Sequence, residues 1–406
     1  MERIQYDGTR RLLHDAETTV IRGNTDAFDF IVVGAGMAGA SVAAALASGS
    51  RVALIEAEPH PGFHATGRSA ALFAPNYGSP LFRALTRASG AFLRAPPDDF
   101  TAHPLLQPRG ALYLARADQQ EQLEAARVAI TAANSVIERL TPAAARTRVP
   151  CLRPHYLSAA LYEPEVYDID VAALLQGFLR QGKARGVQVH FSAHCGAPQR
   201  SGAAWHVPLA QAALSAPVLV NAAGAWADAL GAACGAVPLG LRPLRRTAAL
   251  VEAPAGVSVE TWPAVFDVDE AFYFKPDASR LLISPAEEEP AAPGDAYADD
   301  LAVAVGIERI EAALDFEVRR VQHSWAGLRT FAPDREPVIG YDARVPGLFW
   351  CAGQGGYGIQ SAPAAAQLAA ALARREAVPP SIAAEGVTAD AVSPARFSAT
   401  SARPNS

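Results

Sequence analysis

Residues 28–56 have the sequence FDFIVVGAGMAGASVAAALASGSRVALIE, and this stretch decides the fold. The apolar run 28–34 ends in glycine and predicts a buried strand. The alanine-rich stretch 37–49 predicts a helix packed closely on a sheet, and residues 51–56 predict a second strand. A strand, a helix and a strand within about thirty residues form a βαβ unit, which indicates a parallel sheet covered by helices.

The turn between the first strand and the helix carries the pattern G-x-G-x-x-G at Gly34, Gly36 and Gly39. The first glycine permits a tight turn, the second lets the backbone approach a pyrophosphate, and the third lets helix and strand pack closely. The helix N-terminus adds N–H donors and positive partial charge for the phosphates. Glu56 ends the second strand, where its carboxylate can accept hydrogen bonds from a ribose and disfavours NADP. The alternative is a glycine-rich turn without a ligand.

Two later stretches repeat the order of strand, glycine loop and helix. They are PVLVNAAGAWADAL at 217–230 and LFWCAGQGGYGIQSAPAAAQLAAALA at 348–373. The first motif alone does not separate FAD from NAD, but the second glycine loop, at 353–358, favours FAD. A helix N-terminus aimed at a flavin ring stabilises negative charge there, and an NAD domain has no need of such a loop.

Alternating strands at 247–252, 271–275 and 280–284 predict a mainly antiparallel sheet between these segments. The predicted fold class is therefore α/β: a Rossmann-like FAD-binding domain in three separated segments, with an inserted, mainly antiparallel-sheet substrate domain. The expected divisions are 1–26 (N-terminal extension), 27–90, 160–240 and 326–376 (FAD-binding domain), 91–159 and 241–325 (substrate-binding domain), and 377–406 (a loosely ordered C-terminal tail).

Composition narrows the class of protein. The chain has 406 residues, 50% of them hydrophobic, and a net charge of −6, which excludes wholesale disorder and argues against polybasic nucleic-acid binding. Its four cysteines form no C-x-x-C pair, so a reducing compartment, the cytoplasm, is expected. Residues 1–26 carry no secretory signal pattern. The charge-free stretches 30–50, 201–227 and 345–373 contain glycine clusters and polar residues, so we expect no membrane span.

The chain also resembles a known family in six stretches: VVGAGMAGAS (32–41), IEAEPHPGFHATGRSAA (55–71), VLVNAAGAWAD (218–228), FYFKPD (272–277), HSWAGLRTF (323–331) and GQGGYGIQ (353–360). In this order they resemble the D-amino-acid oxidase family of FAD-dependent amine oxidoreductases and, within it, the D-arginine dehydrogenase branch. The resemblance implies FAD, held without a covalent bond because residues 323–335 contain no cysteine. No metal is expected, since a Pro-Gly pair and a strand pattern interrupt the histidine spacings.

The resemblance assigns residues to the cofactor. To the motif glycines and Glu56 it adds Ala57, Thr66, Arg68 and Ser69 along the flavin and its phosphates, Ala223, Gly224 and Trp226 at the second strand–turn, and Gly355, Gly356, Tyr357, Gly358, Ile359 and Gln360 beside the isoalloxazine.

The resemblance also assigns a substrate site. Arg246 and Arg329 match the arginines that grip a substrate carboxylate, although Arg245 is an adjacent competitor, and Tyr77 and Tyr273 match pocket tyrosines. Further pocket positions are Leu72, Ala111, Ala264, Phe266 and Gly356.

Two departures bear on the substrate. Ala111 stands where the D-arginine dehydrogenase branch has a carboxylate, and Leu72 stands where it has a histidine. Burying an unpaired guanidinium would be costly, so a neutral apolar or aromatic side chain is expected. We expect Glu287, Glu288 and Glu289 to lie in a solvated loop.

The expected activity is FAD-dependent oxidative deamination of such D-amino acids. Hydride passes from Cα to flavin N5, and the imino acid hydrolyses to a 2-oxo acid and ammonia. The expected partners are a small amino acid and an electron acceptor: a quinone, an electron-transfer protein or O₂. Oxidation of secondary amines such as sarcosine or D-proline, oxidation of 2-hydroxy acids, an NAD-dependent reductase and an inactive flavin-binding protein remain alternatives.

Overall fold

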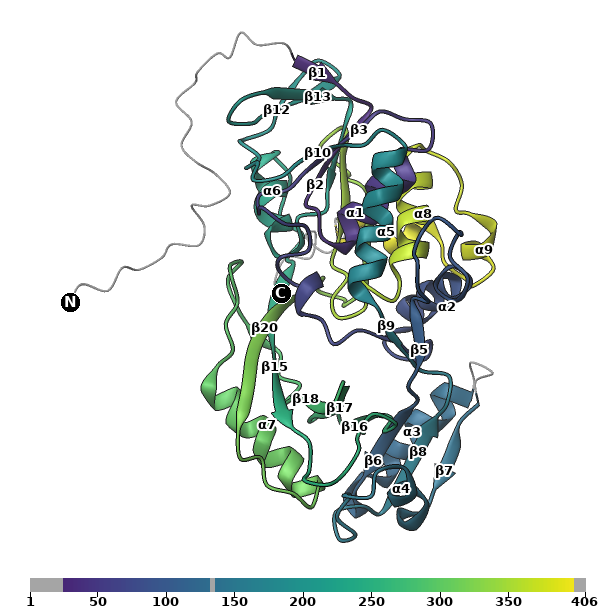
Figure 1. The fold of residues 1–406 in the computed structure, drawn as a ribbon. Helices are drawn as coiled ribbons and strands as arrows, with labels where there is room; N and C mark the ends of the chain where they lie inside the picture. The colour runs from purple at the N-terminus through teal and green to yellow at the C-terminus, as the bar shows by residue number, and fades with distance from the viewer. Residues whose placement is uncertain (1–24, 132–135, 398–406) are drawn as a thin grey trace, which may run out of the picture.

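The computed structural model describes residues 25–131 and 136–397. Of the expected N-terminal extension, residues 1–24 lie outside this description. The chain forms two parts, each built on one large sheet, which stand one above the other in Figure 1.

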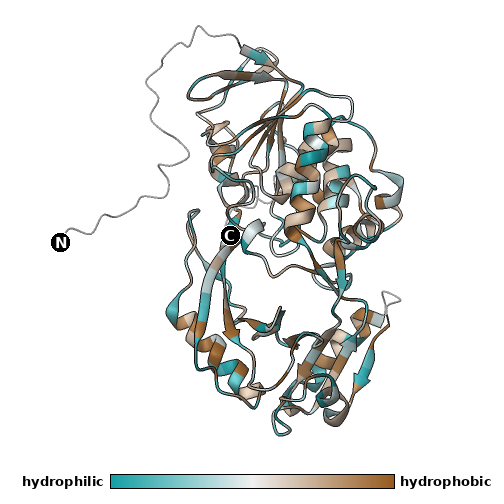
Figure 2. Ribbon diagram, in the orientation of Figure 1, coloured by the Kyte–Doolittle hydropathy of each residue, from teal (hydrophilic) through white to brown (hydrophobic). Residues whose placement is uncertain are grey.

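The upper part contains a six-stranded sheet in the order β10-β3-β2-β14-β22-β21, parallel except for the last pair. Its strands are β2 (Phe30–Val33), β3 (Val52–Ile55), β10 (Gln188–His190), β14 (Val218–Asn221), β21 (Val338–Tyr341) and β22 (Leu348–Ala352). The residues of β2, β3 and β22 are all buried, as expected for a sheet covered on both faces. Figure 2 shows these strands in brown, the hydrophobic end of the scale.

Helices α1 (Met37–Leu46), α5 (Val171–Ala184) and α8 (Ala362–Ala373) cover one face of this sheet, and α2 (Pro80–Arg94) packs on α8 (Figure 1). Alanines dominate α1 and α8, so the two helices lie close to each other and to the strands. The opposite face is covered by α6 (Ala227–Ala233) and a small sheet of β1 (Thr25–Ala27), β11 (Gln199–Ser201), β12 (Ala204–Pro208) and β13 (Ala213–Ala216).

The lower part is a nine-stranded, mostly antiparallel sheet. Its strands are β6 (Ala111–Ala115), β7 (Glu138–Leu140), β8 (Ala159–Glu163), β15 (Arg242–Glu252), β16 (Ala264–Asp267), β17 (Tyr273–Asp277), β18 (Arg280–Ser284), β19 (Glu289–Pro290) and β20 (Val321–Phe331). Helices α3 (Gln120–Thr131), α4 (Pro142–Arg148) and α7 (Asp300–Ala313) pack on it. A short sheet of β4 (Leu72–Phe73), β5 (Leu106–Pro108) and β9 (Tyr167–Ile169) links the two parts.

The parallel sheet with its helices and the antiparallel sheet together confirm the predicted fold class. One expected division is wrong in detail. Strand β8 pairs with β6 and β7 in the lower sheet, so the chain returns to the upper part after residue 163 rather than at 160. The apolar residues of β8 face the core of that sheet, and sequence alternation alone did not reveal their partners.

The C-terminal tail is also more ordered than expected. Residues 380–397 form α9 (Pro380–Ala383), α10 (Ala389–Val392) and a last 3₁₀ turn (Pro394–Phe397). Ile382 and Val392 are buried in the core that α1, α8 and β21 share. Arg396 pairs with Asp334 at 2.7 Å and also donates to the carbonyl of Glu336 at 3.1 Å. The proline- and serine-rich composition of the tail predicted little order, because only a few apolar residues hold it against the core.

Within the described ranges, no helix is both long and apolar enough to cross a bilayer.

Candidate active site

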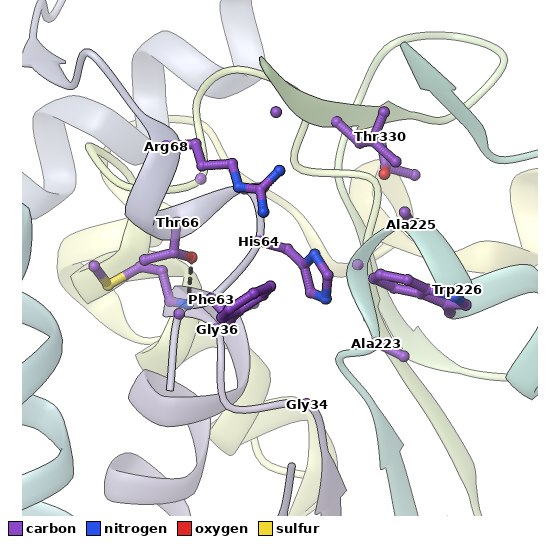
Figure 3. A pocket seen from close by; sticks show the side chains of 18 of the residues that line it. Gly34, Gly36, Phe63, His64, Thr66, Arg68, Ala223, Ala225, Trp226 and Thr330 are labelled. Atoms are coloured by element: carbon purple, nitrogen blue, oxygen red, sulfur yellow. Dashed lines mark hydrogen bonds between the residues drawn. The ribbon is translucent and has the colours of Figure 1, made fainter. Parts of the chain in front are cut away.

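A cavity of about 880 Å³ lies beyond the carboxyl ends of β2, β3, β14 and β22 (Figure 3). Ligands of open α/β sheets bind at this edge, where the strand order changes direction. The glycine turn begins with Gly34, whose φ of 103° is the left-handed geometry that glycine tolerates. A Cβ on Gly39 would stand 1.8 Å from the carbonyl oxygen of Gly34, so this glycine is required for packing and does not line the cavity.

Glu56 fixes the loop around the cavity through backbone contacts. One carboxylate oxygen accepts from the amide of Ala35 at 2.6 Å, and the other accepts from the amide of Glu58 at 2.9 Å. Each oxygen keeps a second lone pair, so the carboxylate can still accept from a ribose hydroxyl. At the start of α1, Met37 donates its amide to the Thr66 hydroxyl at 3.0 Å, which anchors the 3₁₀ turn Thr66–Arg68 over the helix N-terminus.

Arg68 ties a segment of the lower part across this cavity. It donates to the carbonyls of Ala296 at 2.6 Å and Ala326 at 3.0 Å, and it pairs with Asp295. Burial is the largest single influence and raises the pKa of Asp295, but the hydrogen bonds from Arg68 and Tyr297 and the positive charge of Arg68 together outweigh it and hold the pKa below its usual value. Residues 292–297, which line the cavity, are therefore held as a cover over it by an ion pair between the two parts of the molecule.

Three rings gather on the same wall. His64 lies 5.0 Å from Phe63 and 4.7 Å from Trp226, measured between ring centroids, and its Nε2 lies 3.0 Å from a carboxylate oxygen of Glu58 (Figure 3). Its Nδ1 is buried and has no partner among the described residues. A buried ring nitrogen without a partner at the cavity wall indicates a contact that a bound ligand supplies. Sequence reasoning missed this residue, because it considered the histidines only as metal ligands.

Most residues that the resemblance assigned to the cofactor come together on this wall. Those that line the cavity are Gly34, Gly36, Glu56, Ala57, Thr66, Arg68, Ser69, Ala223, Gly224, Trp226, Gly355, Gly356, Gly358 and Ile359. Two others do not. The Tyr357 ring turns away and packs on Phe82 at 4.4 Å, and Gln360 lines a neighbouring pocket instead. On either side of Tyr357, Gly356 and Gly358 line the cavity. The loop therefore presents backbone atoms to the cavity and not an aromatic ring.

The neighbouring pocket has a volume of about 70 Å³ and opens from the large cavity. The residues that line both are Ser69, Ala70, Arg246, Tyr273, Arg329 and Gly356. Arg246 rather than Arg245 faces this junction, because the strand alternation turns Arg245 outward to Asp299 at 3.5 Å. The shared wall is where a ligand of the small pocket would meet a ligand of the large cavity.

The guanidinium of Arg329 lines this junction, and the nearest acidic charge that acts on it is that of Glu288, which raises its pKa. Within the described ranges it makes no hydrogen bond or ion pair, while Tyr77, Tyr273 and Tyr357 lie near enough to influence it. Burial lowers its pKa, but these tyrosines raise it further, so the group stays protonated. A Cβ on Gly356 would stand 2.9 Å from Arg329 Nη1, so the glycine leaves room for the guanidinium. The site therefore offers a buried cation that an anionic ligand can complete.

Arg246 is the second cation of the junction, and burial together with Arg329 lowers its pKa. Its Nη2 lies 3.2 Å from Glu288, whose carboxylate also binds Arg335 through both oxygens, at 2.8 and 3.0 Å. Glu287 accepts from the Thr247 amide at 2.6 Å. Glu288 and Glu289 are exposed, as expected of a solvated loop, but Arg246 and Arg335 hold the Glu288 side chain and the Thr247 amide holds that of Glu287.

The other pocket positions are divided. Leu72, Ala264, Phe266, Tyr77 and Tyr273 line the small pocket. Ala111 does not line it; its side chain is fully buried beneath the wall, in register with Ala264 on the next strand.

Sequence reasoning missed Tyr113, Glu270 and Lys275, which also line the small pocket. Lys275 is paired with Asp168, whereas the Glu270 side chain is exposed. Tyr113 and Glu270 lie outside the six motif stretches, and Lys275 lies within FYFKPD but was assigned no role there.

The residues present fit a flavin dinucleotide. A helix N-terminus and glycine backbone suit a pyrophosphate, Glu56 suits a ribose, and the unpartnered His64 Nδ1 marks a missing contact on the wall. The volume suits a cofactor-sized ligand. The loop 353–358 lines the end of the cavity nearest Arg329, so the redox-active end of such a cofactor would lie beside the small pocket.

Relatives among characterised proteins agree with this assignment. The chain is 30% identical over 397 residues to the tRNA 5-methylaminomethyl-2-thiouridine biosynthesis bifunctional protein MnmC of Polaromonas sp. (strain JS666), covering 86% of this chain and 57% of that protein. It is 26% identical over 230 residues to human mitochondrial sarcosine dehydrogenase, covering 52% of this chain and 24% of the relative. The chain thus spans only part of the length of these relatives.

Among solved structures, glycine oxidase from Geobacillus kaustophilus has the same fold. Its TM-score is 0.77 at 24% identity, with 87% of this chain and 96% of that chain covered. The model of the DAO family, described as FAD dependent oxidoreductase, matches residues 29–372. With the cavity, its glycine loops and the covering segment in place, the chain belongs to the DAO family of FAD-dependent oxidoreductases, and FAD is its cofactor.

Proposed function

We propose that the protein oxidises an α-amino acid at its amine-bearing carbon. The observation that carries this proposal is Arg329, a buried guanidinium that lines the junction of the two cavities and makes no ion pair within the described ranges. Burial and the nearby charge of Arg329 lower the pKa of Arg246, so an anion bound between the two guanidinium groups is strongly favoured. The names of two relatives, glycine oxidase and sarcosine dehydrogenase, support a small amino acid as that anion.

The chain's contribution to the reaction is orientation. Arg329 and Arg246 bind the carboxylate and thereby fix the position of Cα, and Tyr273 lies between them and the pocket wall. Burial raises the pKa of Tyr77, so its hydroxyl stays protonated and donates rather than acting as a base. The bound FAD supplies a two-electron acceptor for the Cα–H bond. Residues 292–297 line the same cavity.

Within this class we favour D-amino acids with neutral apolar or aromatic side chains, for which Phe266 and Leu72 on the pocket wall give support. We also propose that FAD is held without a covalent bond, that a quinone, an electron-transfer protein or O₂ reoxidises it, and that the enzyme works in the cytoplasm. The four free cysteines support the last point. Secondary amines and 2-hydroxy acids are the competing substrate classes.

The test is anaerobic bleaching of the bound flavin by D-amino acids, L-amino acids, N-methyl amino acids and 2-hydroxy acids. We expect rapid bleaching by D-amino acids, and a reduction in kcat/KM of about 100-fold or more in Arg329→Ala with the flavin retained. Arg245→Ala is the matched control, because this arginine lies on the same strand as Arg246 but faces Asp299. Bleaching only by L-amino acids, N-methyl compounds or hydroxy acids would contradict the substrate class, and normal kinetics in Arg329→Ala would contradict the carboxylate site.

A further inference from the structure

A buried acid stands behind the wall of the small pocket, and the proposed reaction does not use it. Glu163, on β8, is fully buried. One carboxylate oxygen accepts from Asn76 Nδ2 at 2.6 Å, and the other accepts from the Tyr113 hydroxyl at 3.0 Å. Tyr113 itself lines the pocket. A buried carboxylate with only two neutral donors is costly, so its position behind a pocket residue calls for an explanation.

The pairing of strands β6, β16 and β17 places three aromatic residues side by side on the pocket wall next to Glu163. Tyr113 pairs with Phe266 on β16, and Phe266 pairs with Tyr273 on β17. The ring centroids of successive pairs are 5.6 Å and 5.9 Å apart, so the three rings form one aromatic row. The row begins at Tyr273, beside the two arginines, and ends at the Tyr113 hydroxyl. A flat side chain attached to a carbon held at the arginines would lie along this row.

The second row of the same face contains small residues. Glu163 pairs with Ala111, and Ala111 pairs with Ala264. Directly opposed residues of neighbouring strands share a face, and residues two apart on one strand do as well. Of the two methyl groups, only that of Ala264 borders the pocket beside the aromatic row, while Ala111 and Glu163 are fully buried behind it.

The direction of the hydrogen bond between Tyr113 and Glu163 decides whether the Tyr113 hydroxyl donates or accepts on the pocket side. An ionised carboxylate only accepts, so the Tyr113 hydroxyl donates its hydrogen bond to Glu163 and stays protonated. The phenol oxygen keeps its lone pairs and can accept one hydrogen bond from the pocket side. Asn76, which is 5% exposed, also keeps a buried Oδ1 that has no partner in the described part of the chain. The Tyr113 oxygen therefore suits a donor on the ligand, whereas Gln360, which also lines the pocket, keeps an unpartnered Nε2 that suits an acceptor.

We propose that the small pocket selects an aromatic amino acid whose ring ends in a hydrogen-bond donor, with Tyr113 as the residue that contacts the donor and Glu163 as the residue that positions Tyr113. The inference rests on the proposed function, because it places the substrate carboxylate at Arg246 and Arg329. It narrows the favoured substrates from apolar or aromatic side chains to rings with a terminal O–H or N–H.

The state of Glu163 makes this preference depend on pH. Burial raises the pKa of Glu163, while Asn76 and Tyr113 lower it, and the net shift is upward. The charged groups that act on it are Glu165, which raises its pKa, and Arg83, which lowers it. Once protonated, the acid can donate to the phenol oxygen, and the pocket then loses its acceptor. The preference is therefore present above the folded pKa of Glu163 and disappears as the pH falls through it.

The experiment compares tyrosine with phenylalanine, which differ only in the ring hydroxyl, each as the enantiomer that reduces the flavin. We expect the wild-type protein to favour tyrosine in kcat/KM by about tenfold or more. Tyr113→Phe should bring this ratio to about one. Glu163→Gln should lower the ratio and abolish its pH profile, since the amide donates to the phenol and does not titrate. Tyr162→Phe is the control, because Tyr162 lies on β8 next to Glu163 and packs on the opposite face.

Each other result has a definite meaning. Equal rates for tyrosine and phenylalanine in the wild type, or an unchanged ratio in Tyr113→Phe, would overturn the inference. Preferred oxidation of lysine or arginine would also overturn it and would point to Glu270 as a cation partner. If Glu163→Gln does not fold, Tyr113→Phe still decides. A flavin that hydroxy acids reduce and no amino acid reduces would instead contradict the proposed function.

Discussion

The cofactor cavity and the substrate pocket are built in opposite ways. The cavity is lined largely by backbone and small residues that follow strands directly in sequence, as at Gly34–Gly36 and in the loop 353–358. The pocket is lined by large side chains from strands that are distant in sequence, such as Tyr113, Phe266 and Tyr273. A shared cofactor constrains backbone geometry, whereas a substrate is selected by side chains. Substitutions in the first region should therefore remove the flavin, and substitutions in the second should change kinetics while the flavin stays.

The largest effect is expected at Gly39, in the first region. In Gly39→Ala the new methyl group would overlap the Gly34 carbonyl, which is backbone and cannot move aside. We expect a loss of stability of about 4 kcal/mol or more and no bound flavin, measured by thermal unfolding and by flavin absorbance. Gly202→Ala is the comparison, because nothing lies within 4 Å of its Cβ position and its left-handed φ of 59° should cost only about 1–2 kcal/mol. Near-normal flavin content in Gly39→Ala would show that the turn can relax.

Gly356 lines both the cofactor cavity and the substrate pocket, so its substitution tests whether flavin binding and substrate kinetics can be separated. In Gly356→Ala the methyl group would stand 2.9 Å from Arg329 Nη1, a flexible end that must shift away. We expect KM for the amino acid to rise about 30-fold, because a displaced guanidinium loses its paired contact with the carboxylate, while flavin content stays high. The measurement is steady-state kinetics beside flavin stoichiometry. Loss of flavin with an unchanged KM would assign Gly356 to the cofactor alone.

Arg335 lies outside the substrate pocket and should still affect substrate binding, so it tests how far the pocket region extends. It shares Glu288 with Arg246, so its removal leaves Glu288 free to pair fully with Arg246 and to compete with the substrate carboxylate. We expect Arg335→Ala to raise KM about fivefold, and Glu288→Gln in the same protein to cancel the increase. A double-mutant cycle on KM measures the coupling. Additive effects would mean that the two residues act separately.

Asp295 tests whether the cofactor cavity depends on the lower part of the molecule. Asp295→Asn weakens the ion pair with Arg68 that holds residues 292–297 across the cavity. The pair is partly exposed, so we expect flavin to dissociate only about threefold faster, with the difference shrinking at high salt. Flavin release in dilute and concentrated NaCl measures this. An identical rate in both proteins would show that the cover is held by its backbone contacts.

The smallest expected effect concerns Glu163 and stability. Its raised pKa means that the folded protein binds this proton more tightly than the unfolded chain. The resulting stabilisation is present below the unfolded pKa and is lost as the pH rises through the folded pKa. The Tm of Glu163→Gln relative to wild type should therefore rise by about 1–2 °C from acidic to neutral pH. A constant difference would show that burial does not perturb the acid.

The same contrast explains what the sequence could predict. The β-α-β unit at 28–56 and the loop at 353–358 are contiguous, and their glycines have steric reasons that are visible in sequence. The network of Tyr113 with Glu163 and the contact of Glu288 with Arg246 depend on register between strands 40 to 50 residues apart. Alternation predicts that such residues face inward but not which partners they meet. The tail at 380–397 was missed because a few buried residues such as Ile382 are enough to dock it.

The docked tail has a practical consequence for the design of shorter forms of the protein. Its last turn places Arg396 on Asp334 and on the Glu336 carbonyl, the two neighbours of Arg335. The end of the chain thus braces the turn from which Arg335 reaches Glu288, and Glu288 in turn touches Arg246. Trimming the chain at residue 377 would leave every residue of both cavities intact. It would nevertheless remove the support for Arg335 and should therefore weaken substrate binding at Arg246.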